Sequence, residues 1–215
     1  NIQSENQLKE MLSNTTSYSL FPLFFGVDEE GGKVARVADA LKLDKTLPMG
    51  EIGAAGDTQA AYDAYQNIGG YLSSYGFNVD FAPVADVLTN VDNTVIGNRA
   101  FSSDAGVAAQ MVSRAVTGLQ ETGVSACLKH FPGHGDTAGD SHTGAAQTDR
   151  TKEEMEAEEF LPFQSGIEAG VDMIMVGHIT APNLTDGDSL PASISEKIIT
   201  GVLRNELGYQ GIIIT

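Results

Sequence analysis

The sequence predicts an α/β fold with a parallel sheet, because short apolar runs alternate with amphipathic helical patterns. Three equally spaced glycines, Gly76, Gly123 and Gly170, each close a helical pattern and precede an apolar run. Polar side chains follow these runs, as they do at the catalytic face of a barrel. No G-x-G-x-x-G motif follows a predicted strand, which disfavours a dinucleotide-binding sheet. Together these observations favour a (β/α)8, TIM-like barrel over an open doubly wound sheet.

Five short apolar runs bounded by turn-forming residues are the predicted strands. They are residues 23–27, 79–84, 124–128, 171–176 and 212–214. A closed barrel has eight strands and typically about 250 residues, so five strands in 215 residues are too few. We therefore expect an incomplete barrel with about five parallel strands. Residues 1–215 would form a single catalytic-domain fragment that lacks the C-terminal part of the barrel and its first strand.

Helical periodicity separates the predicted strands. The helical patterns cover residues 1–19, 58–75, 103–122, 151–167 and 195–207. Leu8, Met11 and Leu12 give the first pattern a minimal apolar face. Asp57 can cap the start of the second pattern, and Gly76 can end it.

The remaining helices also have start and stop signals in the sequence. Gly123 closes the third pattern. Thr151 and Glu154 have the spacing of a capping box at the start of the fourth, and Pro162 suits the first turn of its second piece. Gly208 ends the last helical pattern before the final strand.

Composition limits the partners that the protein can have. Twelve basic and 29 acidic residues give a net charge of −17, which would repel nucleic acid and anionic lipid surfaces. No apolar run reaches the roughly 20 residues of a membrane span. The single cysteine, Cys127, excludes an internal disulfide, and its place in a predicted strand indicates a buried, unreactive thiol. No basic-then-apolar leader opens the chain, so the compartment is left open.

The densest group of chemically active residues lies in residues 129–142, which read KHFPGHGDTAGDSH. Its proline and glycines favour an irregular loop, and the preceding strand puts Lys129 and His130 at a strand end. Asp140 and His142 are two residues apart, so in an extended loop they point the same way. A carboxylate can then hold an imidazole that donates or accepts a proton near pH 7. The alternative is a loop aspartate that caps backbone amides beside an exposed histidine.

A metal site is a second interpretation of the same segment. His130 and His134 have the i, i+4 spacing of a helical metal pair, and Asp136 and His142 could complete the ligand set. Residues 132–133, Pro-Gly, prevent the helix that would give this spacing its meaning, so we expect no metal.

The run KHFPGHGDT followed by DSH resembles the signature of glycoside hydrolase family 3, in the branch of β-N-acetylglucosaminidases with an Asp-Ser-His acid/base element. Residues 28–36, DEEGGKVAR, resemble the family pattern D-x-E-G-G-x-V-x-R, with Lys33 where arginine is usual. Residues 97–101, GNRAF, resemble G-x-R-(S/A)-F, and VGHI around His178 resembles a strand end that lines the sugar pocket.

The resemblance implies a role for each of these positions. His142 would be the acid/base group, oriented by Asp140. Five residues would bind the sugar: Asp28, Arg99, Lys129, His130 and His178. Glu30 and Arg36 would form a structural ion pair.

The implied activity is that of a retaining exo-β-N-acetylglucosaminidase, which releases terminal GlcNAc from peptidoglycan fragments or related β-linked amino sugars through a covalent glycosyl-enzyme. The carbohydrate would be the only partner, and no cofactor is required. Residues 208–215 resemble the run into the strand whose next residue is the nucleophilic aspartate, so we expect that aspartate directly after Thr215. The 215-residue chain alone would then be inactive and prone to self-association.

Several alternatives stay open. The enzyme could be β-glucosidase-like, or phosphorolytic, since a neutral histidine does not repel phosphate. It could be a metal-dependent hydrolase that uses His130, His134 and Asp136, or a noncatalytic sugar-binding fragment. Lys129 could simply pair with Asp28 or Asp86. Arg99 could be a surface arginine, and His178 could be a satisfied core histidine.

Overall fold

A computed structural model of the chain describes residues 2–137 and 146–215. Five parallel strands form its main sheet, in chain order from one edge to the other. They are β1 (Gly26–Val27), β4 (Val79–Asp80), β5 (Ser125–Phe131), β7 (Met173–Val176) and β9 (Ile212–Ile214). The sheet is open within the described residues. The predicted α/β class, with five parallel strands of an incomplete barrel, is confirmed.

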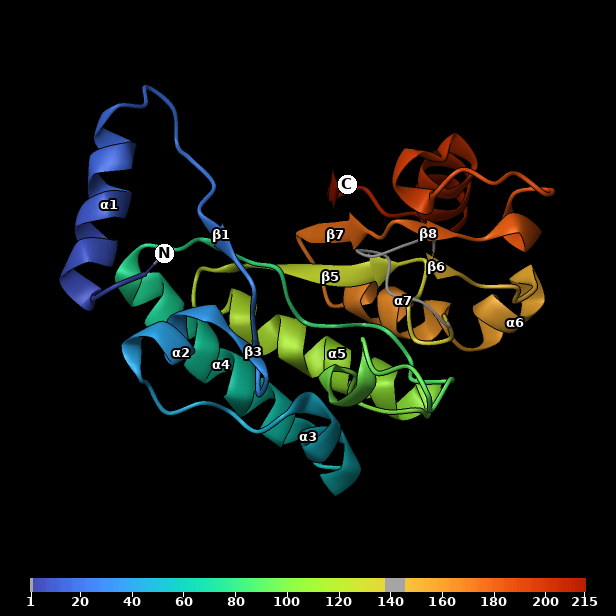
Figure 1. The fold of residues 1–215 in the computed structure, drawn as a ribbon, viewed down its shortest axis with the longest axis horizontal. Helices are drawn as coiled ribbons and strands as arrows, with labels where there is room; N and C mark the ends of the chain where they lie inside the picture. Colours follow the sequence, from blue (N-terminus) through green and yellow to red (C-terminus); the bar gives the residue numbers. More distant parts are fainter. Residues whose placement is uncertain (1, 138–145) are drawn as a thin grey trace.

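The crossover helices cover one face of this sheet. They are α4 (Thr58–Tyr75), α5 (Ala105–Gln120) and α7 (Phe160–Glu168), which pack side by side, and Figure 1 shows them together beneath β5. The Asp57 side chain accepts a hydrogen bond from Gln59 N, and Gly76 ends α4 with a φ of 103°. The cap and the stop expected from the sequence are therefore both present.

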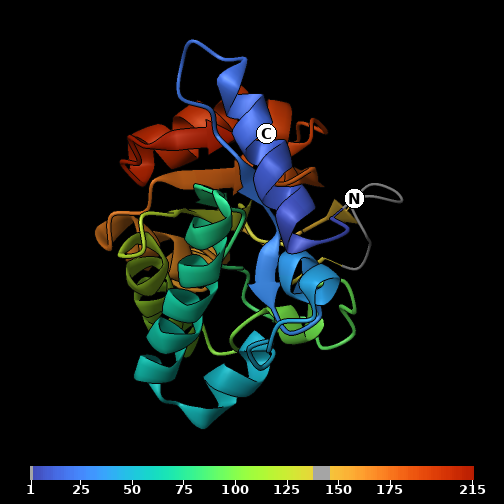
Figure 2. The same ribbon diagram turned by 90° about the vertical axis from the view of Figure 1, so that its left-hand side faces the viewer.

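Other elements flank this framework. Helix α6 (Lys152–Ala157) begins with the expected capping box of Thr151 and Glu154. Helix α1 (Glu5–Ser17) packs on α4 through buried Leu8 and Leu12 and stands in front of the sheet in Figure 2. Met11 is 45% exposed, so its assignment to the apolar face was wrong. The final crossover is a π-helix, η4 (Lys197–Glu206).

Side-chain hydrogen bonds and a proline make two strands shorter than predicted. The Asn78 carboxamide accepts from Phe25 N and donates to Leu23 O, so it occupies backbone groups that a longer β1 would pair in the ladder. Strand β4 stops before Pro83, which has no N–H to donate. Strand β5, in contrast, extends through Phe131.

Short elements between the strands were not predicted. They are the antiparallel pair β2 (Glu29–Gly31) and β3 (Val34–Ala35), the helices α2 (Arg36–Leu41) and α3 (Met49–Ala55), the 3-10 turns η1 (Gly97–Arg99), η2 (Pro182–Leu184) and η3 (Ala192–Ile194), and the parallel pair β6 (Ala146–Gln147) and β8 (Ile179–Thr180). Each is shorter than the window in which periodicity becomes visible.

The core lies mainly between the sheet and its crossover helices. A smaller apolar cluster on strands β4, β5 and β7 contains Val79, Cys127 and Met173. Burial raises the pKa of the Cys127 thiol to about 12, which agrees with the expected unreactive cysteine. Within the described ranges, none of the helices combines the length and apolarity needed to span a bilayer.

Candidate active site

The carboxyl ends of the parallel strands bring the candidate polar residues to one edge of the sheet. Asp28 directly follows β1, Lys129 and His130 lie near the end of β5, and His178 follows β7. Arg99 reaches the same region from η1, since it contacts a residue of the β2 segment. All five candidate sugar-binding residues therefore lie on loops or strand ends at the face where α/β folds bind ligands.

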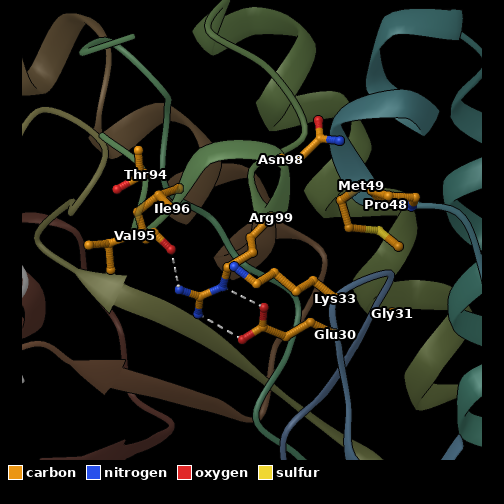
Figure 3. A pocket seen from close by; sticks show the side chains of 10 residues that line it. All are labelled: Glu30, Gly31, Lys33, Pro48, Met49, Thr94, Val95, Ile96, Asn98 and Arg99. Atoms are coloured by element: carbon orange, nitrogen blue, oxygen red, sulfur yellow. Dashed lines mark hydrogen bonds and ion pairs between the residues drawn. The ribbon is translucent and has the colours of Figure 1, made fainter. Parts of the chain in front are cut away.

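Four charged residues form a cluster there, which we call the strand-end ion cluster: Asp28, Glu30, Arg99 and Lys129. Lys129 Nζ lies 2.6 Å from Asp28 Oδ1 and 2.7 Å from Glu30 Oε1. Arg99 donates from Nε and Nη2 to the two Glu30 oxygens, both at 2.8 Å. Figure 3 shows this two-pronged contact and the bond from Arg99 Nη1 to Val95 O, which is 2.9 Å long.

The members of the cluster differ sharply in exposure. The side chains of Lys129 and Glu30 are each 2% exposed, whereas that of Asp28 is 44% exposed. Burial alone would raise the pKa of Glu30, but the hydrogen bonds and charges of Arg99 and Lys129 lower it to about 2. Burial likewise opposes the charge of Lys129, and Glu30 and Asp28 outweigh it and raise the pKa. Glu30 and Lys129 therefore stay ionised at neutral pH, and the cluster presents Asp28 to solvent.

The expected structural pair of Glu30 and Arg36 is wrong. Arg36 is exposed at the start of α2, while the backbone of β2 turns Glu30 inward to Arg99 and Lys129. Lys129 does pair with Asp28, as one alternative held, and its second carboxylate partner is Glu30 and not Asp86.

His130 is held by Asp86, another buried carboxylate. The ring Nδ1 lies 2.7 Å from Asp86 Oδ2, and Asp86 Oδ1 accepts from the backbone N–H groups of His130 and His134 at 3.2 and 2.7 Å. Burial alone would raise the pKa of Asp86. The interactions with His130 and His134 outweigh burial, so the pKa of Asp86 lies below its ordinary value. Burial lowers the pKa of His130 despite Asp86. A neutral His130 then donates from Nδ1 to Asp86 and keeps Nε2 as an acceptor.

Two hollows adjoin these residues. One of about 220 Å³ is lined by His130 and His178, and His178 Nδ1 lies 2.6 Å from Ser193 Oγ. The other, of about 290 Å³, lies beside the Glu30–Arg99 contact and is also lined by Lys33 (Figure 3). His178 is exposed, so it is not a buried core histidine.

Asp140 and His142 lie outside the described residues, so their proposed pairing stays a prediction. The described residues on either side are well anchored. His134 O accepts from Asn93 Nδ2 at 2.7 Å, and Thr148 Oγ1 donates to Asp136 Oδ2 at 2.9 Å.

The metal alternative concerns His130, His134 and Asp136, together with His142, which lies outside the described residues. Across residues 2–137 and 146–215, no group of three His, Cys, Asp or Glu side chains could hold a metal ion. The His130 and His134 rings meet edge to face with centroids 5.6 Å apart, and His134 Nδ1 lies 2.6 Å from Thr137 Oγ1.

Sequence reasoning missed the roles of Glu30 and Asp86. Glu30 lies in β2 and Asp86 follows β4, and each lies where a buried cation or histidine needs an acceptor. The polar character of these positions was visible, but their partners are 69 and 44 residues away in the chain.

Comparisons with known proteins give a consistent result. The family model described as "Glycosyl hydrolase family 3 N terminal domain" matches residues 1–215. Beta-hexosaminidase A of Pseudoalteromonas piscicida is 41% identical, over 93% of this chain and 35% of the relative. Beta-hexosaminidase of Stenotrophomonas maltophilia (strain R551-3) is 35% identical, over 99% of this chain and 63% of the relative.

Solved structures are similar over the whole described fold. A glycoside hydrolase family 3 beta-N-acetylglucosaminidase from Paenibacillus sp. str. FPU-7 has a TM-score of 0.92 and 36% identity, over 99% of this chain and 41% of that one. Native NagZ from Neisseria gonorrhoeae has a TM-score of 0.89 and 30% identity, over 99% and 62%. The chain thus spans between about a third and just under two thirds of these relatives.

Proposed function

Because this chain belongs to glycosyl hydrolase family 3, we propose that it forms part of a retaining exo-β-N-acetylglucosaminidase. The enzyme removes terminal β-linked GlcNAc from peptidoglycan fragments or related amino sugars. The single observation that carries this proposal is the strand-end ion cluster, in which buried Lys129 holds a half-exposed Asp28 carboxylate at the sheet edge. Such a carboxylate is fixed in direction and free on one side to accept hydrogen bonds from sugar hydroxyls.

The other cluster members act on the sugar directly or through Asp28. Arg99 donates two hydrogen bonds to Glu30 and one to Val95 O. The other N–H groups of its guanidinium donate hydrogen bonds to the substrate. Lys129 uses two of its three donors on Asp28 and Glu30, so its main effect is to orient Asp28. His130 and His178 line the neighbouring hollow and offer ring nitrogens to the hydroxyl or acetamido groups.

His142 supplies the proton chemistry in this proposal, with Asp140 as its orienting partner. The imidazole protonates the leaving oxygen in the first step and activates water in the second, while a carboxylate nucleophile forms the glycosyl-enzyme. The domain assignment stays as expected from the sequence: residues 1–215 are one catalytic-domain fragment of the barrel.

The names of the relatives favour hexosaminidase activity over the β-glucosidase-like alternative. The test is turnover by the full-length gene product of an aryl β-N-acetylglucosaminide and the matching β-glucoside, with and without chelator and phosphate. We expect preference for the acetamido sugar, no loss with chelator, and free GlcNAc whose first-formed anomer is β. Loss with chelator would support the metal hydrolase, a sugar phosphate would support phosphorolysis, and binding without turnover would support the noncatalytic alternative.

We also propose that the 215-residue chain alone self-associates. Strands β1 and β9 are the edges of an open sheet. Phe24, shortly before β1, is 70% exposed, and Ile212, in β9, is 44% exposed. Unpaired edges with apolar neighbours favour pairing with another chain. Size-exclusion chromatography should give a concentration-dependent elution volume, and a monomer at all concentrations would refute this proposal.

A further inference from the structure

A buried glutamate lies directly beneath the loop that begins at Pro132. Glu159, at the junction of α6 and α7, is 1% exposed. A Cβ atom added to Gly133 would lie 2.7 Å from Glu159 Cγ and 3.0 Å from its Cβ. The loop backbone at Gly133 therefore packs against the aliphatic part of this side chain.

Among the described residues, Arg150 is the cation that pairs with Glu159. Arg150 Nε lies 3.2 Å from Glu159 Oε2, and Arg150 Nη2 donates to Glu158 Oε2 at 2.8 Å. Within the described residues, neither Glu159 oxygen nor Arg150 Nε has a partner in hydrogen-bond geometry. The contact between Glu159 and Arg150 is therefore one of charge, and it exists only while Glu159 is ionised.

Arg150 is linked to the loop through its own backbone N–H group. Arg150 N donates to Thr148 Oγ1 at 3.3 Å, and Thr148 Oγ1 donates to Asp136 Oδ2 at 2.9 Å. These contacts join Asp136 and Thr148, which are 12 residues apart in the chain. In the sequence, the proposed acid/base residues fall between these two positions.

We propose that Glu159 is a charge-dependent positioning residue: its carboxylate fixes Arg150 and, through Thr148, the Asp136 end of the loop. This inference rests on the proposed function, because it assigns Glu159 to the support of that site. Glu159 contacts neither the strand-end ion cluster nor the hollow beside His130, so it acts through the loop and not on the sugar.

The surroundings of Glu159 bring its pKa close to neutral pH. Burial raises the pKa of Glu159 to about 7; Arg150 opposes this rise, and Glu158 and Asp136 add to it. Met155 Cε lies 3.8 Å from the same added Cβ position at Gly133. Above pH 7 the ionised carboxylate holds Arg150, and below it the neutral acid releases that charge.

The experiment compares the wild type with Glu159→Gln in the full-length protein at about pH 6 and pH 8.5. The amide keeps the shape but has no charge, so it mimics the acid form. At pH 8.5 we expect kcat to fall roughly fivefold with little change in KM, within the range of coupling in an ion-pair network. At pH 6 the two proteins should be alike. The matched control, Glu153→Gln on the exposed face of α6, should change neither value.

Stability and a double-mutant cycle separate positioning from a structural role. Glu159→Gln should have an equal or higher Tm at pH 8.5, since a buried amide costs less than a buried carboxylate. Arg150→Met should lower kcat by a similar factor, and the double variant should be no worse than either single variant. A fall in kcat that follows Tm at both pH values, or additive losses, would overturn the proposal.

Hydrogen exchange tests the same point without any activity. The amides of residues 133–137 should exchange faster at pH 6 than at pH 8.5 in the wild type, after correction for intrinsic rates. In Glu159→Gln they should be equally fast at both. If no GlcNAc is released but this pattern holds, only the proposed function fails. If exchange in the wild type is independent of pH, the positioning role is refuted.

Discussion

Replacing Glu30 by glutamine removes the charge at the centre of the strand-end ion cluster and keeps the shape of the side chain. Among the described residues, Glu30 is the only carboxylate that pairs with both Arg99 and Lys129. Without it, the Arg99 fork loses its acceptor, and Lys129, which is 2% exposed, keeps only Asp28. The variant therefore leaves positive charge buried and poorly compensated.

The size of the effect follows from the pKa. Glu30 titrates at about 2 in the folded protein and at 4.5 when unperturbed. Each pKa unit corresponds to about 1.4 kcal/mol, so the ionised group stabilises the fold by roughly 3 kcal/mol. A lowered carboxylate pKa gives stability that is fully present above pH 4.5 and is lost as the pH falls toward 2. Removal of one partner from a buried ion pair typically costs a similar 3–5 kcal/mol.

Urea unfolding of the full-length protein at pH 7 and at about pH 3.5 tests this argument. Glu30→Gln should lower the free energy of unfolding by about 3 kcal/mol at pH 7 and by less at acidic pH. The control is Asp39→Asn, which breaks an exposed ion pair with Lys45 at 2.8 Å and should cost under about 1 kcal/mol. A loss below 1 kcal/mol for Glu30→Gln, or one that does not depend on pH, would refute the reasoning.

Three further outcomes are expected. Asp80 is fully buried, and only its Oδ1 accepts a hydrogen bond among the described residues; burial raises its pKa well above the usual value. A raised carboxyl pKa makes wild-type stability fall as the pH rises, so the stability of Asp80→Asn relative to wild type should increase with pH, and a relative stability that falls as the pH rises would contradict the raised pKa. Cys127 should not react with a disulfide reagent at pH 8 until urea is added; rapid labelling of the folded protein would contradict its burial. Gly135→Ala would drive a methyl group into the Val87 carbonyl and should cost about 1–3 kcal/mol or more, whereas Gly201→Ala meets open space and should stabilise η4 by up to about 1 kcal/mol; equal Tm changes would refute both.

The sheet and its crossover helices could be predicted because their signals are local. A helix such as α4 has its cap, its apolar stripe and its terminal glycine within 20 consecutive residues, and the structure has both ends where the sequence puts them. Gly76, Gly123 and Gly170 all adopt positive φ values, as their place between helix and strand requires. The extent of β1 depended instead on Asn78, a side chain far away in the sequence.

The sequence predicted where the candidate site lies but not which of its side chains pair with one another. The sequence brought Asp28, Arg99 and Lys129 to the strand ends, since each follows or lies near a predicted strand. It could not assign Glu30 to Arg99 and Lys129, because a buried carboxylate binds whichever cations the tertiary fold brings to it. The pairing of Asp86 with His130 could not be predicted for the same reason.

Asp28 offers the most direct test of the central claim that the strand-end ion cluster binds the terminal sugar. Its side chain is 44% exposed and contacts Lys129, so Asp28→Asn should change Tm little. In the full-length enzyme, the same change should lower kcat/KM for a terminal β-N-acetylglucosaminide by about 10- to 100-fold, the value of a hydrogen bond to a charged group. An unchanged kcat/KM in a folded Asp28→Asn variant would mean that the sugar binds elsewhere.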